Sequence, residues 1–95
     1  MTERAAWLER TLRDALQPAH LEVEDESEQH RGHAGARGGG SHFRVVIVSD
    51  RFAGLAPVAR QRAVYAALGA AMGKEIHALA MTVLTPEEWE RQGPR

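Results

Sequence analysis

The chain has 95 residues, of which 43% are hydrophobic and 26% are charged, values that are ordinary for one small globular domain. Its formal net charge of −1 argues against a strong, general nucleic-acid binder, and no stretch approaches the roughly 18 apolar residues of a membrane span. Cysteine is absent, which excludes a four-cysteine metal site, a disulfide framework and a thiol nucleophile within this chain.

The first part of the chain predicts a helix followed by a strand. Residues 1–4 begin acidic and lack the basic and then apolar pattern of a signal peptide, so we expect a cytoplasmic location. Thr2 can cap a helix that runs to residue 16, and Pro18 stops it because proline has no amide hydrogen. The apolar stripe of this helix consists of Ala5, Leu8, Leu12, Ala15 and Leu16. Residues 21–24 alternate apolar and acidic side chains, which is typical of a strand with one solvated face.

A glycine-rich segment and a second strand follow. Residues 27–41 lack large apolar side chains and are rich in glycine, which predicts a mobile loop. A loop of this length between two strands is more often functional than structural. Residues 42–49 (HFRVVIVS) form the clearest strand because β-branched and aromatic residues dominate them. Residues 51–55 predict a turn whose Phe52 and Leu55 fill the core.

The last part of the chain predicts a helix, a strand and a short helix. Pro57 suits the first turn of a helix that runs to about residue 72 and ends before Gly73 in left-handed geometry. One side of this helix carries Val58, Tyr65, Leu68 and Met72, with Val64 and Ala71 beside them. Residues 75–84 form the third strand. A short helix over about residues 86–91 begins with a capping box between Thr85 and Glu88, and Trp89 packs it onto the domain.

This order of elements predicts an α+β fold in a single domain over residues 1–95. The second and third strands are joined through a helix and can therefore be parallel, whereas the first two strands form a hairpin with a long loop. We therefore expect a three-stranded mixed sheet with helices packed on one face.

Four histidines are candidates for metal binding: His30 and His33 in the loop, His42 where the loop enters the sheet, and His77 near the third strand. Neutral imidazole binds zinc, copper, nickel and iron, and two histidines on one iron describe half of a Rieske-type site. Each histidine taken alone also fits an ordinary exposed or packed residue. Because the chain has no thiol, a partner would have to bring any sulfur ligand.

Other motifs are weaker. Asp25, Glu26 and Ser27 beside His30 contain the residue types of a catalytic triad, but one local run does not suit triad geometry, and we expect no enzymatic activity. Residues 32–35 and 35–38 match the GxxG pattern of KH nucleic-acid-binding domains, yet they lie between predicted strands rather than between helices. Residues 29–74 carry seven basic and one acidic side chain, which indicates either an uneven solvated surface or a phosphate-facing one.

Several motifs together resemble the BolA family over about residues 3–90, in collinear order. They are DES at 25–27 followed by His30, SHFRVVIVSDRF at 41–52, GL at 54–55, RQR at 60–62, VY at 64–65, HAL at 77–79 and TPEEW at 85–89. The resemblance implies a KH-like, type II-like fold of order αββααβ without a GxxG loop.

The resemblance also implies a function. BolA-like proteins are partners of monothiol glutaredoxins, which hold a [2Fe-2S] cluster with a cysteine and glutathione, and the BolA-like chain supplies histidine ligands to the shared cluster. The family's C-terminal ligand corresponds to His77, and its loop ligand corresponds to His30 or to the neighbouring His33. The expected role is non-enzymatic, in cluster trafficking or iron regulation.

A second function is compatible with the resemblance, because bacterial members are also regarded as DNA-binding transcriptional regulators of the stress response. The basic region 42–74 would then face DNA phosphates. The residues expected to do so are Arg44, Arg51, Arg60, Arg62 and Lys74. Homodimerisation in the absence of a partner is left open.

Overall fold

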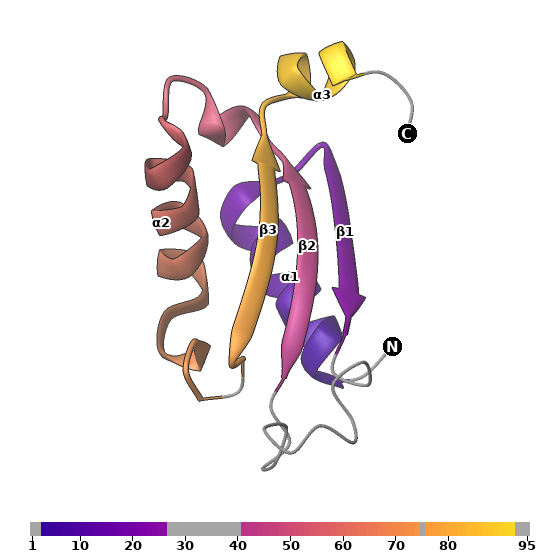
Figure 1. The fold of residues 1–95 in the computed structure, drawn as a ribbon, viewed down its shortest axis with the longest axis vertical. Helices are drawn as coiled ribbons and strands as arrows, with labels where there is room; N and C mark the ends of the chain where they lie inside the picture. Colours follow the sequence, from indigo (N-terminus) through magenta and orange to yellow (C-terminus); the bar gives the residue numbers. More distant parts are fainter. Residues whose placement is uncertain (1–2, 27–40, 75, 93–95) are drawn as a thin grey trace.

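The computed structural model describes residues 3–26, 41–74 and 76–92, which form one three-stranded sheet and its surrounding helices (Figure 1). Of the loop expected at residues 27–41, only Ser41 is described. The elements in chain order are α1 (Glu3–Leu16), β1 (His20–Asp25), β2 (His42–Val48), the 3-10 helix η3 (Asp50–Phe52), α2 (Pro57–Leu68), the 3-10 helix η4 (Gly69–Ala71), β3 (Ala78–Leu84) and α3 (Pro86–Gln92).

The sheet has the order β1-β2-β3, with β1 antiparallel to β2 and β2 parallel to β3. This arrangement confirms the predicted α+β fold, the hairpin between the first two strands and the parallel crossover to the third. Figure 1 shows α1 behind the sheet and α2 alongside β3. None of the helices in the described ranges is long and apolar enough to cross a membrane.

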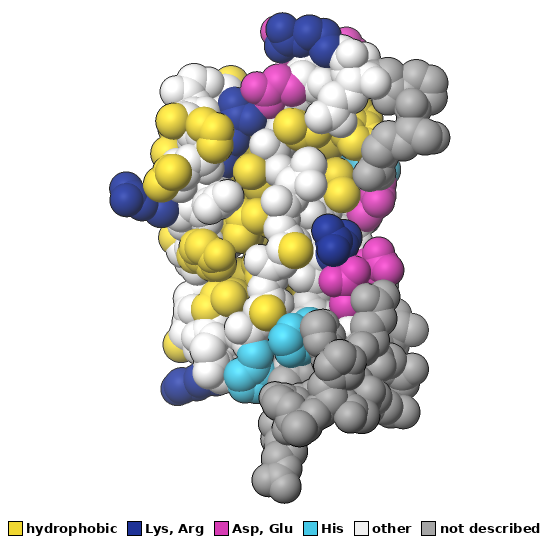
Figure 2. All heavy atoms as spheres, in the orientation of Figure 1, with side chains coloured by type: hydrophobic (Ala, Val, Ile, Leu, Met, Phe, Trp, Pro, Cys, Tyr) yellow, Lys and Arg dark blue, Asp and Glu magenta, His cyan; other side chains and the backbone are white. Residues whose placement is uncertain are grey.

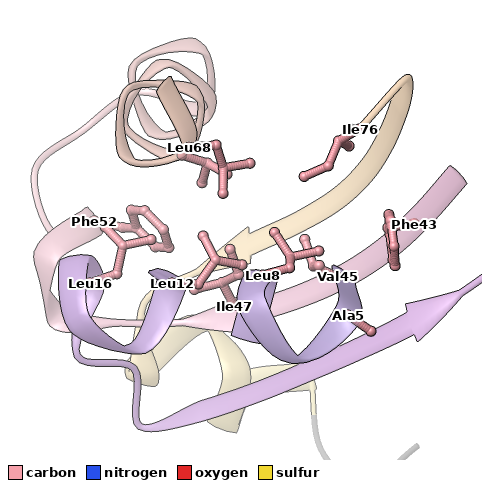
Figure 3. Close-up of a cluster of buried hydrophobic side chains, with 11 residues drawn as sticks. Ala5, Leu8, Leu12, Leu16, Phe43, Val45, Ile47, Phe52, Leu68 and Ile76 are labelled. Atoms are coloured by element: carbon pink, nitrogen blue, oxygen red, sulfur yellow. The ribbon is translucent and has the colours of Figure 1, made fainter. Parts of the chain in front are cut away.

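The core lies between α1, α2 and the sheet. The predicted stripe of α1 is confirmed, because its buried residues are Ala5, Leu8, Leu12 and Leu16. Successive members of this stripe are three or four residues apart and therefore lie on one helical face. They meet alternate residues of β2, whose buried side carries Phe43, Val45 and Ile47 (Figure 3). Phe52 of η3 is fully buried in the same cluster, as predicted, whereas Leu55, which was predicted to fill the core with it, is only partly buried and lies outside the cluster.

The buried side of α2 differs from the prediction. Val58 and Tyr65, which were predicted on the same apolar side as Leu68 and Met72, are 58% and 42% exposed. The rest of the prediction is confirmed, because Val64, Leu68 and Ala71 are buried and Met72 packs against the core. The buried residue that the prediction missed is Arg60, which lies four positions before Val64 on the same helical face. The apolar pattern of α2 did not predict its buried side fully, because Arg60 occupies a core-facing position while the apolar Val58 and Tyr65 face solvent.

The boundaries after α2 also differ from the prediction. The helical region extends to Ala71, close to the predicted residue 72, but it consists of two pieces: α2 ends at Leu68, because Gly69 has a φ of 58°, and the chain continues as η4. Gly73 has the expected positive φ, 88°, but it turns the chain after η4 rather than ending α2. β3 starts at Ala78 rather than at residue 75. Before it, the fully buried Ile76 forms an isolated bridge with Met72.

The guanidinium of Arg60 joins three parts of the fold. Its Nη1 and Nη2 donate to the two carboxylate oxygens of Glu88 in α3 at 2.6 and 3.1 Å. Its Nε donates to the carbonyl of Leu55 at 2.9 Å, and Nη1 also donates to the carbonyl of Val83 in β3 at 3.1 Å. One side chain therefore ties the start of α2 to the preceding turn, to the end of β3 and to α3.

α3 is held by its cap and by one aromatic contact. The predicted capping box is confirmed: the Glu88 N–H donates to Thr85 Oγ1 at 3.2 Å, and the Thr85 N–H donates to Glu88 Oε1 at 2.9 Å. Trp89 stacks on the His20 ring of β1 with centroids 4.8 Å apart, which confirms that Trp89 packs onto the domain. The hydrogen bonds from Arg60 and from the Thr85 N–H lower the pKa of Glu88 to about 2.

We expect this pair to make stability depend on pH at the acidic end. Because the pKa of Glu88 falls from an ordinary 4.5 to about 2 on folding, the unfolded chain binds the proton more tightly. The contribution is complete above the ordinary pKa and is lost as pH falls toward the folded value. Glu88→Gln should therefore lower the urea midpoint at neutral pH, and its difference from the wild type should shrink between about pH 5 and pH 2.

Glu87→Gln is the matched control, because Glu87 is the exposed neighbour of Glu88 on the same helix. Urea denaturation of both variants at several pH values should show the acid-dependent loss only for Glu88→Gln. Equal midpoints for Glu88→Gln and Glu87→Gln at every pH would mean that the Arg60–Glu88 pair does not stabilise the fold.

Candidate metal-ligand site

Two of the candidate histidines lie at the end of the sheet where β2 and β3 begin. His42 is the first residue of β2, and His77 directly precedes β3. The parallel register pairs His42 with Ala78, so both strands start at the same end of the sheet. Figure 2 shows histidine side chains close together there.

His77 is exposed, and its backbone and ring are both bonded to Ser41. The His77 N–H donates to the Ser41 carbonyl at 2.9 Å, and the Ser41 N–H donates to the ring Nδ1 of His77 at 3.0 Å. The exposed ring is therefore fixed at one nitrogen. His77 is therefore not packed in the core, although its hydrogen bonds also fit an ordinary structural histidine.

Ser41 is the buried residue beneath this ring, with only 1% of its surface exposed. Its hydroxyl oxygen accepts a hydrogen bond of 2.6 Å from Nη1 of Arg4 in α1. Its carbonyl accepts from the N–H groups of both His77 and Ala78. Ser41 thus connects α1, the start of β2 and the start of β3 at the position of the candidate ligand.

The described residues do not by themselves assemble a metal site. Within residues 3–26, 41–74 and 76–92, no three His, Cys, Asp or Glu side chains are grouped to hold a metal ion. Imidazole is a good ligand for iron and zinc, and the chain has no cysteine to complete a sulfur-rich site.

His30 and His33 lie outside the described residues, so the choice between them as the loop ligand stays a prediction. The two residues that flank this segment are described. Ser41 is bonded to His77, and the Glu26 N–H donates to the His42 carbonyl at 2.8 Å. Both flanking residues, Glu26 and Ser41, are therefore held at the end of the sheet where His77 lies.

The five basic residues proposed to face DNA differ in burial and in hydrogen-bond partners. Arg60 is buried and holds Glu88, so it is not available for a phosphate. Arg44 donates to Glu26 at 3.0 Å, and Arg51 donates to Gln17 at 3.3 Å. The remaining two, Arg62 and Lys74, are exposed. Figure 2 shows Lys and Arg side chains scattered over this face of the molecule.

Sequence reasoning missed two residues of the site, Ser41 and Arg4. Ser41 stood in a quoted motif without an assigned role, and Arg4 appeared only as part of the amino terminus. Their contact spans 37 positions in the chain. Neither helical periodicity nor strand alternation carries information about such a contact.

Comparison with protein families and with known proteins gives a consistent result. A model of the BolA-like protein family matches residues 12–88. The DNA-binding transcriptional regulator BolA of Vibrio cholerae is 45% identical over 84 residues, which are 88% of this chain and 76% of that protein. BolA-like protein 1 of Homo sapiens is 47% identical over 78 residues, 82% of this chain and 55% of that protein. This chain thus spans little more than half of the human relative.

Solved structures share the fold. The solution structure of BolA1 from Mus musculus has a TM-score of 0.82 and 37% identity, with 100% of this chain and 75% of that chain covered. The BolA domain of SufE1 from Arabidopsis thaliana has a TM-score of 0.81 and 39% identity, with 93% and 98% covered.

We expect His77→Ala to remain folded but to lose about 1 kcal/mol in the free energy of unfolding, because the buried Ser41 N–H would lose its acceptor. His77→Asn is the matched control, since the Asn side-chain oxygen reaches nearly the position of Nδ1 and can accept the same bond. Urea denaturation should place His77→Asn close to the wild type. An unfolded His77→Ala, or equal stability of all three proteins, would contradict the role assigned to this hydrogen bond.

Proposed function

The chain belongs to the BolA family, and from that premise we propose that it is a partner protein that supplies histidine ligands to a [2Fe-2S] cluster shared with a monothiol glutaredoxin. BolA-family proteins are regulator or partner-type proteins rather than known enzymes. The proposed role is therefore non-enzymatic, in cluster trafficking or iron regulation within the cytoplasm.

The observation that carries the proposal is the position of His77. Its ring is exposed, and Ser41 and the start of β3 hold it at the end of the sheet where β2 and β3 begin. A ligand that completes a centre shared between two proteins must be reachable from outside its own fold, and His77 meets that requirement. The segment that carries His30 and His33 is attached at the same end of the sheet, so one of them is the second ligand in this proposal.

The missing thiolates assign the remaining ligands to the partner. Without cysteine, this chain has no thiolate to contribute, and the glutaredoxin cysteine and glutathione would supply the sulfur. In a bound cluster, replacing thiolate by neutral imidazole raises the reduction potential.

A second candidate function is DNA binding, and the name of the Vibrio cholerae relative favours it. This role would depend on the exposed Arg62 and Lys74 together with Arg44 and Arg51. Arg60 is excluded from it by its pairing with Glu88. The net charge of −1 and the scattered basic side chains favour at most a weak, salt-sensitive interaction (Figure 2).

We expect the wild-type protein to form a complex with a cluster-loaded monothiol glutaredoxin and to change its visible absorption, circular dichroism and electron spin resonance spectra toward those of a histidine-ligated [2Fe-2S] centre. His77→Asn should lose this change while remaining folded, because it keeps the bond to Ser41 but has no imidazole. His30→Ala and His33→Ala, measured separately, identify the loop ligand.

His20→Gln controls for the loss of any histidine, because His20 begins β1, which is antiparallel to β2 and so starts at the opposite end of the sheet. It should give the wild-type spectrum. A His77→Asn protein whose complex has the wild-type spectrum would remove His77 from the ligand set. Absence of any complex with the wild-type protein would reject the partnership itself.

For the DNA alternative, we expect the logarithm of the binding constant to fall linearly with the logarithm of the salt concentration. Replacing Arg62 or Lys74 by alanine should reduce this slope by about 1 each if both contact phosphates. Glu87→Gln controls for a change in net charge away from these residues. Fluorescence anisotropy with duplex DNA measures the slope, and unchanged slopes for both alanine variants would exclude these side chains as phosphate contacts.

A further inference from the structure

The hydrogen bond between Ser41 and His77 determines where the imidazole carries its proton. A backbone N–H can only donate, so Nδ1 of His77 must offer a lone pair to the Ser41 N–H at 3.0 Å. A neutral imidazole has one protonated nitrogen, and in this arrangement it is Nε2. The exposed ring therefore presents an N–H group, rather than a lone pair, at its outer nitrogen.

Metal coordination by either ring nitrogen is incompatible with this bond. A metal at Nδ1 takes the lone pair that the Ser41 N–H now uses. A metal at Nε2 displaces the ring proton, and in a neutral ring that proton must move to Nδ1, where it would face the Ser41 N–H. In both cases the Ser41–His77 hydrogen bond breaks.

We infer that Ser41 is a positioning residue that keeps His77 in a closed, Nε2-protonated state, so that His77 binds metal only when the Ser41 hydrogen bond is released. This inference rests on the proposed function in taking His77 as a ligand. It adds a means by which the free protein resists adventitious metal ions, while a cluster already held by a partner brings further contacts that offset the lost bond.

The surroundings of Ser41 make the release costly. Ser41 is 1% exposed, so water does not readily replace the ring as acceptor for its N–H. Its hydroxyl is bonded to Arg4 of α1, and its carbonyl accepts from two N–H groups at the start of β3. These contacts hold the backbone of Ser41 in place, so the amide cannot turn away together with the ring.

The first test needs no metal. Two-bond proton–nitrogen correlation spectra of the nitrogen-15-labelled protein at about pH 8, where histidine is ordinarily neutral, report the tautomer of each imidazole. We expect His77 in the Nε2–H form in the wild type and in Ser41→Ala, which keeps the N–H. Both Ser41→Ala and Ser41→Pro lose the hydroxyl that accepts from Arg4, but only Ser41→Pro also loses the N–H, so it should change the tautomer balance of His77 relative to Ser41→Ala. An Nδ1–H tautomer at His77 in the wild type would overturn the inference.

The second test measures the competition with a metal, using Zn²⁺ as a diamagnetic probe followed by the His77 ring resonances. Ser41→Pro should bind Zn²⁺ at His77 about twofold to tenfold more tightly than Ser41→Ala, which corresponds to the net contribution of one hydrogen bond. Equal or weaker binding by a folded Ser41→Pro would contradict the inference. Neither test involves a glutaredoxin, so failure of the proposed partnership leaves both results interpretable.

Discussion

The bidentate contact between Arg60 and Glu88 is the interaction on which the arrangement of the carboxyl-terminal half depends. An arginine in a core-facing position of a helix is costly to bury unless each of its three guanidinium nitrogens finds an acceptor. Here the carboxylate of α3 and the carbonyls of Leu55 and Val83 supply those acceptors. The same contact orients α2 relative to β3, and so it fixes the direction in which the chain returns from α2 to the sheet.

That return leads to the candidate site at the opposite end of the sheet. Because β2 and β3 are parallel, the residues that precede the two strands lie at the same end of the sheet, and this brings Ser41 to His77. α1 contributes from behind through Arg4. The site is therefore made by three segments that are distant in the chain, and the ring that it presents is exposed while the residue that holds it is buried.

Local patterns predicted much of this fold. The stripe of α1, the strand β2 and the capping box between Thr85 and Glu88 depend on residues a few positions apart, and all were found as expected. The prediction for α2 missed the burial of Arg60, because that burial depends on Glu88, 28 positions away. For the same reason His77 could be predicted as a candidate from its type and motif, whereas its contact with Ser41 could not.

The strand order has a consequence for how copies of this protein meet one another. β1 is an edge strand, and an edge strand offers unpaired backbone groups to any other extended chain. Its six residues include three carboxylates: Glu22, Glu24 and Asp25. Two copies placed edge to edge along β1 would bring these negative charges together, so the strand repels its own kind. The alternating segment that forms the outer strand of the hairpin thus also disfavours pairing between two copies along β1.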